Sequence, residues 1–208
     1  MKEKNMQEKK VIGIIPCKKV SSRLPGKNTM FLGGKMLFEW SVEYAKNEGI
    51  TPVVSTDDEY VIGWCNDHGI RCVREKVDDS NMCNCVDQVL NVYGCDYFVL
   101  LQPTSPIRER GLLSSIISDG VPTSVYTSNK IKVIGHLDGK FQEAFRDQDG
   151  NTRFLHQHDG NMVVVNTEWY NRTHKLFNDE SIFIDSRKPY NLQIDTKDDF
   201  ETIRKIVS

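Results

Sequence analysis

The chain has 208 residues, of which 38% are hydrophobic and 27% charged, and its formal net charge is −2 at pH 7. This length suits one domain with a full hydrophobic core. The composition excludes a disordered chain, a collagen-like fibre and a small disulfide-rich protein. Because 27 Lys and Arg nearly balance 29 Asp and Glu, the overall charge does not indicate a nucleic-acid or anionic-membrane partner. We expect a single domain over 1–208.

The cysteines and the polar start bear on the cellular compartment. None of the six cysteines shows the C-x-x-C spacing of zinc sites, and Cys83 and Cys85 are the closest two. The opening MKEKNMQEKK is followed by an apolar run of only five residues, 11–15, too short for a signal peptide or a membrane span. We therefore expect a cytoplasmic protein with reduced thiols and no membrane partner.

Apolar, β-branched runs alternate with segments of helical periodicity through the first 118 residues. Strands are expected at 11–16, 50–56, 70–74 and 96–103, and helices at 36–49, 59–69, 84–94 and about 110–118. Such alternation is typical of a mostly parallel sheet covered by helices on both faces. The sequence thus predicts an α/β fold.

The pattern changes in the second half of the chain. A strand is expected at 121–128, and period-2 alternation around Asp138-Gly139 then indicates hairpins. We interpret 129–158 as a β-ribbon that projects from the α/β body. The chain returns in a buried strand at 160–166 and ends in a helix at 196–207.

The loop CKKVSSRLPGKN follows the first predicted strand and is strongly basic. It carries Lys18, Lys19, Arg23 and Lys27 within ten residues, and Gly26 allows backbone N–H groups to approach a ligand. Cations at the carboxyl end of a parallel strand suit a polyphosphate. The alternative is a solvated basic loop; the Walker A and G-x-G-x-x-G patterns are both absent. We expect the loop to be exposed to solvent.

Two further polar segments follow predicted strands. LLQPTSPIR places Gln102, Thr104, Ser105 and Arg108 in a proline-stiffened turn, although by itself the pattern slightly favours an ordinary strand exit with a Ser/Thr turn. In NLQIDTKDDF, Asp195 is expected at a strand end. Its neighbours read as helix-start residues: Thr196 is expected to cap the last helix, and Asp198 and Asp199 to complement its dipole.

Together these motifs resemble the acylneuraminate (CMP-sialic acid) cytidylyltransferase family. IIPCKKVSSRLPGKN is similar to the family's I-x-A-R-x-G-S-K-R-L-P-G-K-N loop, and LLQPTSPIR to its LLQPTSPLR. VVSTDDEYV and QIDT…DF resemble two further family stretches in the right order, so the likeness runs from 11 to 207. It implies a three-layer, nucleotide-diphospho-sugar-transferase-like (Rossmann-like) fold. The chain is identified as a divergent member.

The resemblance also implies a reaction and a set of site residues. CTP and an anionic sugar acid would give a CMP-conjugate and pyrophosphate with the help of Mg²⁺. The implied catalytic residues are Lys18, Arg23 and Lys27. Nucleotide binding would add Cys17, Ser22, Asn28 and Arg74. Acceptor binding would fall to Gln102, Thr104, Ser105, Arg108, His158 and Asn161. Metal binding would fall to Asp195 and Gln193, and the ribbon 129–158 would form a homodimer.

Several departures from the family pattern keep alternatives open. Lys18 replaces an arginine, Ser22 replaces a lysine, Gln193 replaces the first aspartate of D-x-D, and 80–85 lacks the usual Asp-Thr. The acceptor is then a nonulosonate, or else a phosphonate, a phospho-alditol or a 3-deoxy-octulosonate. A third reading is a non-catalytic domain that binds nucleotides.

Overall fold

A mixed sheet organises the part of the chain that the computed structural model describes, residues 9–21, 24–76, 81–132, 135–137, 140–142, 154–178 and 181–207. Its strands lie side by side in the order β11-β7-β10-β6-β1-β4-β5. The strand bounds are β1 (Val11–Pro16), β4 (Thr51–Thr56), β5 (Arg71–Arg74), β6 (Tyr97–Leu100), β7 (Thr123–Lys132), β10 (Phe154–Asn166) and β11 (Ile182–Asp185). β10 alone runs against both of its neighbours, so the sheet is mostly parallel, as the sequence predicts.

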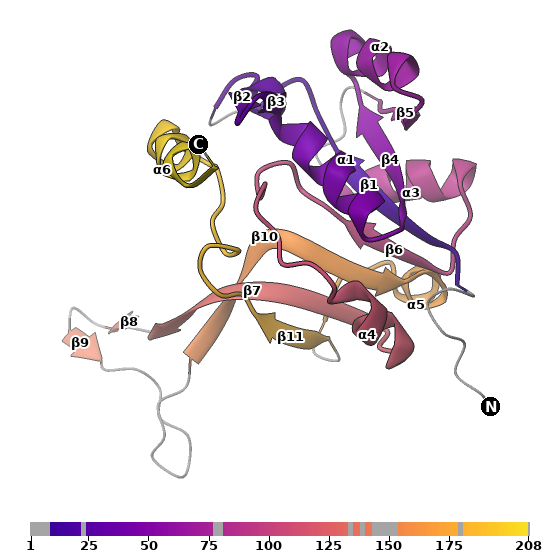
Figure 1. Ribbon diagram of the computed structural model, residues 1–208. Coiled ribbons are helices and arrows are strands. Elements are labelled where there is room, and N and C mark those ends of the chain that lie inside the picture. Colours follow the sequence, from indigo (N-terminus) through magenta and orange to yellow (C-terminus); the bar gives the residue numbers. More distant parts are fainter. Residues whose placement is uncertain are drawn as a thin grey trace.

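Helices cover both faces of this sheet (Figure 1). Their bounds are α1 (Leu37–Asn47), α2 (Glu59–Asp67), α3 (Met82–Val92), α4 (Leu113–Ser118), α5 (Thr167–Thr173) and α6 (Lys197–Val207). None of the helices in the described ranges has the length and apolarity to cross a membrane.

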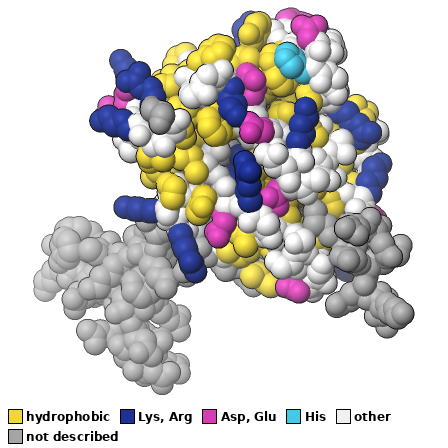
Figure 2. Space-filling model, viewed as in Figure 1, with side chains coloured by type: hydrophobic (Ala, Val, Ile, Leu, Met, Phe, Trp, Pro, Cys, Tyr) yellow, Lys and Arg dark blue, Asp and Glu magenta, His cyan; other side chains and the backbone are white. Residues whose placement is uncertain are grey.

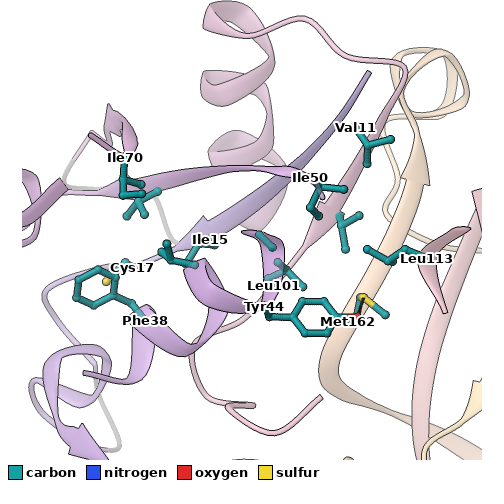
Figure 3. Packing of buried hydrophobic residues seen from close by; sticks show 14 of the residues in the cluster. Val11, Ile15, Cys17, Phe38, Tyr44, Ile50, Ile70, Leu101, Leu113 and Met162 are labelled. Atoms are coloured by element: carbon teal, nitrogen blue, oxygen red, sulfur yellow. Dashed lines mark hydrogen bonds between the residues drawn. The ribbon is translucent and has the colours of Figure 1, made fainter. Parts of the chain in front are cut away.

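Strand alternation separates the core into two layers. Successive side chains of a strand point to opposite faces, so Ile15 of β1 packs with α1, α2 and α4, while Ile12 and Ile14 pack with α3 and α5. Figure 3 shows the first layer, where Phe38 lies beside Cys17 and Ile15, and Tyr44 approaches Met162. The result is a helix–sheet–helix sandwich, which matches the expected three layers.

A third, smaller cluster joins two distant parts of the chain. Leu32 and Leu37 pack with Ile194, Phe200 and Ile203. Leu32 belongs to a short hairpin of β2 (Phe31–Leu32) and β3 (Lys35–Met36), which the sequence reading did not anticipate. Figure 1 shows α6 on the side of this hairpin. This packing holds the segment before α6 against the short 3-10 helix η2 (Lys27–Thr29), where the basic loop ends.

The predicted ribbon is present in part. Beyond the sheet body, β7 and β10 continue as an antiparallel pair with Phe154 opposite Lys132. β8 (Gly135–Leu137) pairs with β9 (Lys140–Gln142) at the far end, so this part projects from the body (Figure 1). The expected turns at 138–139 and 147–151 lie outside the described residues. β10 is one strand over 154–166, not a separate strand at 160–166, because its pairing to β7 continues past a register shift.

Two other expectations need correction. The segment 191–195 is not a strand, and the last strand is β11, which the sequence reading missed. Instead Ile194 donates its backbone N–H to the carbonyl of Thr104 at 2.8 Å, which holds this irregular segment against the turn after β6.

On the face drawn in Figure 2, Lys and Arg side chains are spread among acidic and apolar ones. This distribution agrees with the nearly balanced charge of the sequence.

Candidate active site

A cavity of about 170 Å³ opens where β1, β5 and β6 end, beside the first turn of α3. These three strands are parallel, so their carboxyl ends meet at one edge of the sheet, the usual ligand position in open α/β folds. The lining residues are Pro16, Lys18, Asn28, Glu75, Asn81, Met82, Cys85, Gln102, Pro103 and Thr104. The basic loop and the LLQPTSPIR turn therefore converge on one cavity.

Main-chain hydrogen bonds fix the start of the basic loop to β4. Cys17 donates its backbone N–H to Ser55, and its carbonyl accepts from the hydroxyl of Thr56 at 2.5 Å. Its side chain is buried in the core, and this burial, together with the nearby carboxylate of Asp58, raises the pKa of the thiol well above its usual value. Cys17 is absent from the cavity lining, so its place here is to anchor the loop.

The end of the loop turns back on its beginning. Gly26 has a left-handed backbone with φ of 65°, a conformation that glycine adopts without strain. Asn28 then donates its amide to the carbonyl of Lys18 at 2.9 Å. Lys18 and Asn28 consequently face the same cavity from the two ends of the loop.

The basic loop was expected to be exposed to solvent, but Lys27 is buried, with only 7% of the residue accessible. Its Nζ donates to the carbonyl of Ile194 at 3.0 Å and lies 3.2 Å from Oδ1 of Asp195. The packing of α6 against the β2–β3 hairpin brings these groups together. Lys27 is thus a buried cation, oriented by the segment before α6.

Arg108 holds the turn after β6 in place. Its guanidinium is buried and donates to the carbonyls of Asn161 and Gln102 and to the hydroxyl of Ser41. It also lies over the ring of Tyr44. Through these three acceptors Arg108 joins α1, β10 and the turn after β6. It is absent from the lining of the cavity. Asn161 is buried too and donates to the carbonyl of Tyr190 at 2.6 Å.

Gln193 reaches the same turn from the opposite side. Its Nε2 donates weakly to the hydroxyl of Thr104 at 3.4 Å and lies over Gly160. A Cβ at Gly160 would meet that Nε2 and lie 3.2 Å from Oε1 of Gln102, so a side chain here would displace the end of Gln193. Gln102, Thr104 and Gln193 therefore lie together, whereas Ser105 is fully buried beneath them.

Thr196 and Asp199 form the N-terminal cap of helix α6. Thr196 and Asp199 bond reciprocally: Thr196 N donates to the Asp199 carboxylate at 2.8 Å, and Asp199 N donates to the Thr196 hydroxyl at 3.2 Å. Partial burial works against ionisation of Asp199, but the bonds from Thr196 prevail and lower its pKa. Asp195 contributes its backbone N–H to this cap, 3.1 Å from Oδ2 of Asp199, while its carboxylate pairs with Lys27.

The side chains of Asp195 and Gln193 suit a metal ion whose coordination is completed by substrate phosphates, rather than an ion held by protein side chains alone. Among the described residues no three His, Cys, Asp or Glu side chains lie close enough to hold an ion. Asp195 supplies one carboxylate, whose side chain is 26% exposed, and Gln193 an amide. Mg²⁺ commonly takes one or two carboxylates and completes its shell with substrate phosphates and water.

Other expected residues lie elsewhere. Arg74 pairs with Glu59 in an exposed ion pair and is absent from the cavity lining. Ser22 and Arg23 lie outside the described residues. His158 lies in β10 opposite Thr127, and its side chain lies outside the described part of the chain.

Sequence reading missed the far wall of the cavity. This wall consists of Glu75, Asn81, Met82 and Cys85. Asn81 caps α3 by accepting from Cys83 N, so the helix begins earlier than the expected residue 84. The available signal was position: Glu75 directly follows a strand end, where polar groups of parallel sheets meet ligands.

Comparison with known proteins shows which family the chain resembles. A family model described as cytidylyltransferase matches residues 12–207. The N-acylneuraminate cytidylyltransferase of Streptococcus agalactiae serotype III (strain NEM316) is 27% identical over 215 residues, covering 92% of this chain and 52% of the relative. The 3-deoxy-manno-octulosonate cytidylyltransferase of Bdellovibrio bacteriovorus is 29% identical over 100 residues, covering 47% and 40%. The chain thus spans about half the length of the first of these.

The fold has solved counterparts as well. The structure of CMP:2-keto-3-deoxy-manno-octonic acid synthetase complexed with CTP superposes with a TM-score of 0.70 at 17% identity, covering 95% of this chain and 98% of that one. The expected nucleotidyltransferase-like α/β fold is therefore confirmed. Since the family model covers nearly the whole sequence, the resemblance read from the motifs is confirmed too, and the chain belongs to the cytidylyltransferase family.

Proposed function

We propose that this protein transfers CMP from CTP to an anionic sugar acid, sialic acid or a related nonulosonate, and releases pyrophosphate. The observation that carries the proposal is the convergence of the basic loop and the turn after β6 on one strand-end cavity, with Asp195 paired to Lys27 at the end of that loop, within a chain that matches the family model over 12–207. The relatives named N-acylneuraminate cytidylyltransferase support the acceptor class.

The reaction needs charge stabilisation rather than a nucleophilic side chain. A hydroxyl of the acceptor attacks the α-phosphorus and gives up its proton to solvent, the bond between the α-phosphorus and the bridging oxygen breaks, and pyrophosphate leaves with that oxygen. Negative charge spreads over the phosphate oxygens, so preorganised cations lower the barrier. Lys27 is held in place by two bonds and suits this task. Lys18, whose side chain is 30% exposed, supplies another cation and lines the cavity directly.

We assign Gln102 and Thr104 to the acceptor side, because both line the cavity and come from the turn after β6 rather than from the basic loop. Arg23, Ser22 and His158 keep their proposed roles from the family resemblance. Ser105, Arg108 and Asn161 act through the turn that they support, since all three are buried. Arg74, in its ion pair with Glu59, needs a change of side-chain conformation to reach the nucleotide.

Mg²⁺ is the proposed cofactor, held by Asp195 and Gln193 together with the phosphates of CTP. When bound, it would neutralise phosphate charge and orient the α-phosphate for displacement.

We also propose a cytoplasmic homodimer formed through the ribbon 129–158. An isolated two-stranded ribbon is marginal in water and gains stability when another surface covers it, and twofold symmetry is the commonest way for copies to associate. A monomer at micromolar concentration in light scattering would contradict this part of the proposal.

The alternative acceptor is a 3-deoxy-octulosonate, which the Bdellovibrio relative favours. A pyrophosphate-release assay with each of the four NTPs and a panel of anionic sugars separates the two, and mass spectrometry identifies the conjugate. We expect turnover with CTP and a nonulosonate. Turnover with 3-deoxy-octulosonate alone would select the alternative. Nucleotide binding without turnover on any acceptor would indicate a non-catalytic relative.

A further inference from the structure

One end of a helix forms much of the far wall of the cavity. Asn81, Met82 and Cys85 line the cavity, and all three belong to the N-cap or the first turn of α3. Only Glu75, at the end of β5, completes this wall from another element. The shape of the cavity on this side therefore depends on what holds the start of α3 in place.

Tyr170 of α5 contacts the start of α3 with its hydroxyl. The hydroxyl lies 2.9 Å from Oδ1 of Asp87 and 3.1 Å from the carbonyl of Cys83, so both of these acceptors belong to α3. The residue is only 1% exposed, and its ring packs edge-on against Phe98 of β6 with 5.3 Å between the ring centroids. Because the sheet fixes the ring, the position of the hydroxyl is set from outside α3.

The surroundings of this hydroxyl favour a lasting hydrogen bond. Burial, and then the hydrogen bond to Asp87, raise the pKa of Tyr170, so the hydroxyl keeps its proton and remains a donor. Hydrogen bonds to a carboxylate are stronger than those between neutral groups. His174 of α5 adds two contacts: its Nε2 lies 3.4 Å from Oδ2 of Asp87, and its carbonyl accepts from Sγ of Cys83 at 3.8 Å. Helix α5 thus holds the start of α3 at several points.

We infer that Tyr170 is a positioning residue for nucleotide binding, which fixes the first turn of α3 and with it the far wall of the cavity. The inference rests on the proposed function, because this cavity is the proposed nucleotide site. Tyr170 is absent from the cavity lining, so it acts through α3 and does not touch the ligand. A wall that is already ordered raises affinity, since binding does not have to order it. The cations Lys18 and Lys27 belong to the basic loop, so loss of the hydroxyl should weaken binding more than it slows the chemical step.

A merely structural role for Tyr170 makes a different prediction. Loss of a bond that only stabilises the fold opens every buried group more often, whereas loss of a bond that positions α3 opens the start of that helix selectively. Two buried thiols distinguish these cases. Cys85 lies in α3 at the cavity, and Cys65 lies in the core layer on the other face of the sheet.

The test compares wild type with Tyr170→Phe, which loses the hydroxyl and keeps the ring. Calorimetric titration measures affinity for CTP, with Mg²⁺ and no acceptor, and peptide mass spectrometry measures alkylation of Cys85 and Cys65 by iodoacetamide. We expect CTP affinity to fall about fivefold, the net worth of one hydrogen bond, and Cys85 alone to react faster. The matched control is Tyr93→Phe, the same change at the other end of α3, which should alter neither measurement.

Two further variants examine the same bond from its acceptor. Asp87→Ala removes the carboxylate, and because that side chain is 35% exposed, the fold should tolerate the change even where Tyr170→Phe does not fold. Asp87→Asn keeps an oxygen that accepts from Tyr170. We expect Asp87→Ala to reproduce the effects of Tyr170→Phe, and Asp87→Asn to stay near wild type.

Unchanged CTP affinity or unchanged Cys85 alkylation in the folded variants overturns the inference, and so does an increase shared equally by Cys85 and Cys65. Pyrophosphate release is scored separately with the panel of acceptors, and KM for CTP should change more than kcat. Binding of CTP without turnover on any acceptor contradicts the proposed function alone. Turnover with unchanged CTP affinity in the variants contradicts the role of Tyr170 alone.

Discussion

The Nζ of Lys27 lies 3.2 Å from Oδ1 of Asp195, although 168 residues separate them in the chain. The pair joins the end of the basic loop to the segment that precedes α6. It also links the two charged groups on which the proposed chemistry depends most, a cation for the phosphates and a carboxylate for the metal. Four predictions follow from this arrangement and from the turn beside it.

Replacing Lys27 with alanine should lower kcat/KM for the nucleotide by about 2–4 kcal/mol of transition-state stabilisation, the range for loss of one preorganised donor. Because Lys27 also satisfies the carbonyl of Ile194, the variant should lose about 1–3 kcal/mol of stability. Steady-state kinetics and urea unfolding measure the two effects. Lys46→Ala, an exposed lysine of α1, is the control. Unchanged kinetics in Lys27→Ala would remove Lys27 from the catalytic group.

Replacing Asp195 with asparagine should reduce turnover by about 10²–10³-fold at ordinary Mg²⁺ and raise the Mg²⁺ concentration needed for half-maximal rate. Helix α6 should keep its stability, since Thr196 and Asp199 form its cap. Gln193→Asp should shift the Mg²⁺ dependence the other way, by restoring a second carboxylate. The control is Asp198→Asn, an exposed first-turn acid. A rate loss with unaltered Mg²⁺ dependence would mean that Asp195 only orients Lys27.

Replacing Arg108 with methionine should destabilise the fold by about 3 kcal/mol, because buried acceptors lose their charged donor. Chemical denaturation checks this, with Arg110→Met on the exposed neighbour as control. At temperatures where the variant stays folded, KM for the acceptor should change less than stability does. A raised KM with unchanged stability would instead place Arg108 in the acceptor site, as the family resemblance implies.

Replacing Gly160 with alanine should cost about 1–2 kcal/mol, since its φ is 69° and L-residues are strained there. The new Cβ would also displace the amide of Gln193, so the acceptor side should be disturbed. Gly63→Ala makes the opposite prediction: nothing lies within 4 Å of its Cβ in the middle of α2, so stability should rise by about 0.5–1 kcal/mol. Thermal melts compare the two. Equal stability changes would contradict this account of Gly160.

Apart from the β2–β3 hairpin, the strand–helix order of the first 118 residues was predictable from sequence, because the other elements there carry their own period of apolar residues. The basic loop and the LLQPTSPIR turn were also predictable as neighbours, because each follows a strand and the carboxyl ends of parallel strands meet at one edge of the sheet. Thr196 as the cap of the last helix was a local signal as well, and the structure confirms it.

Contacts between distant segments are what the sequence could not provide. In the sequence, Lys27 is a cation in a loop and Asp195 an acid near the start of a helix. Only the packing of α6 on the β2–β3 hairpin brings the two together. The family resemblance implies that Arg108 binds the acceptor. In the structure its guanidinium is buried and donates to three protein groups. Glu75 belongs to no sequence motif, and only the structure places it in the cavity wall. Local periodicity determines which elements form, whereas burial and long-range pairing decide which charges meet.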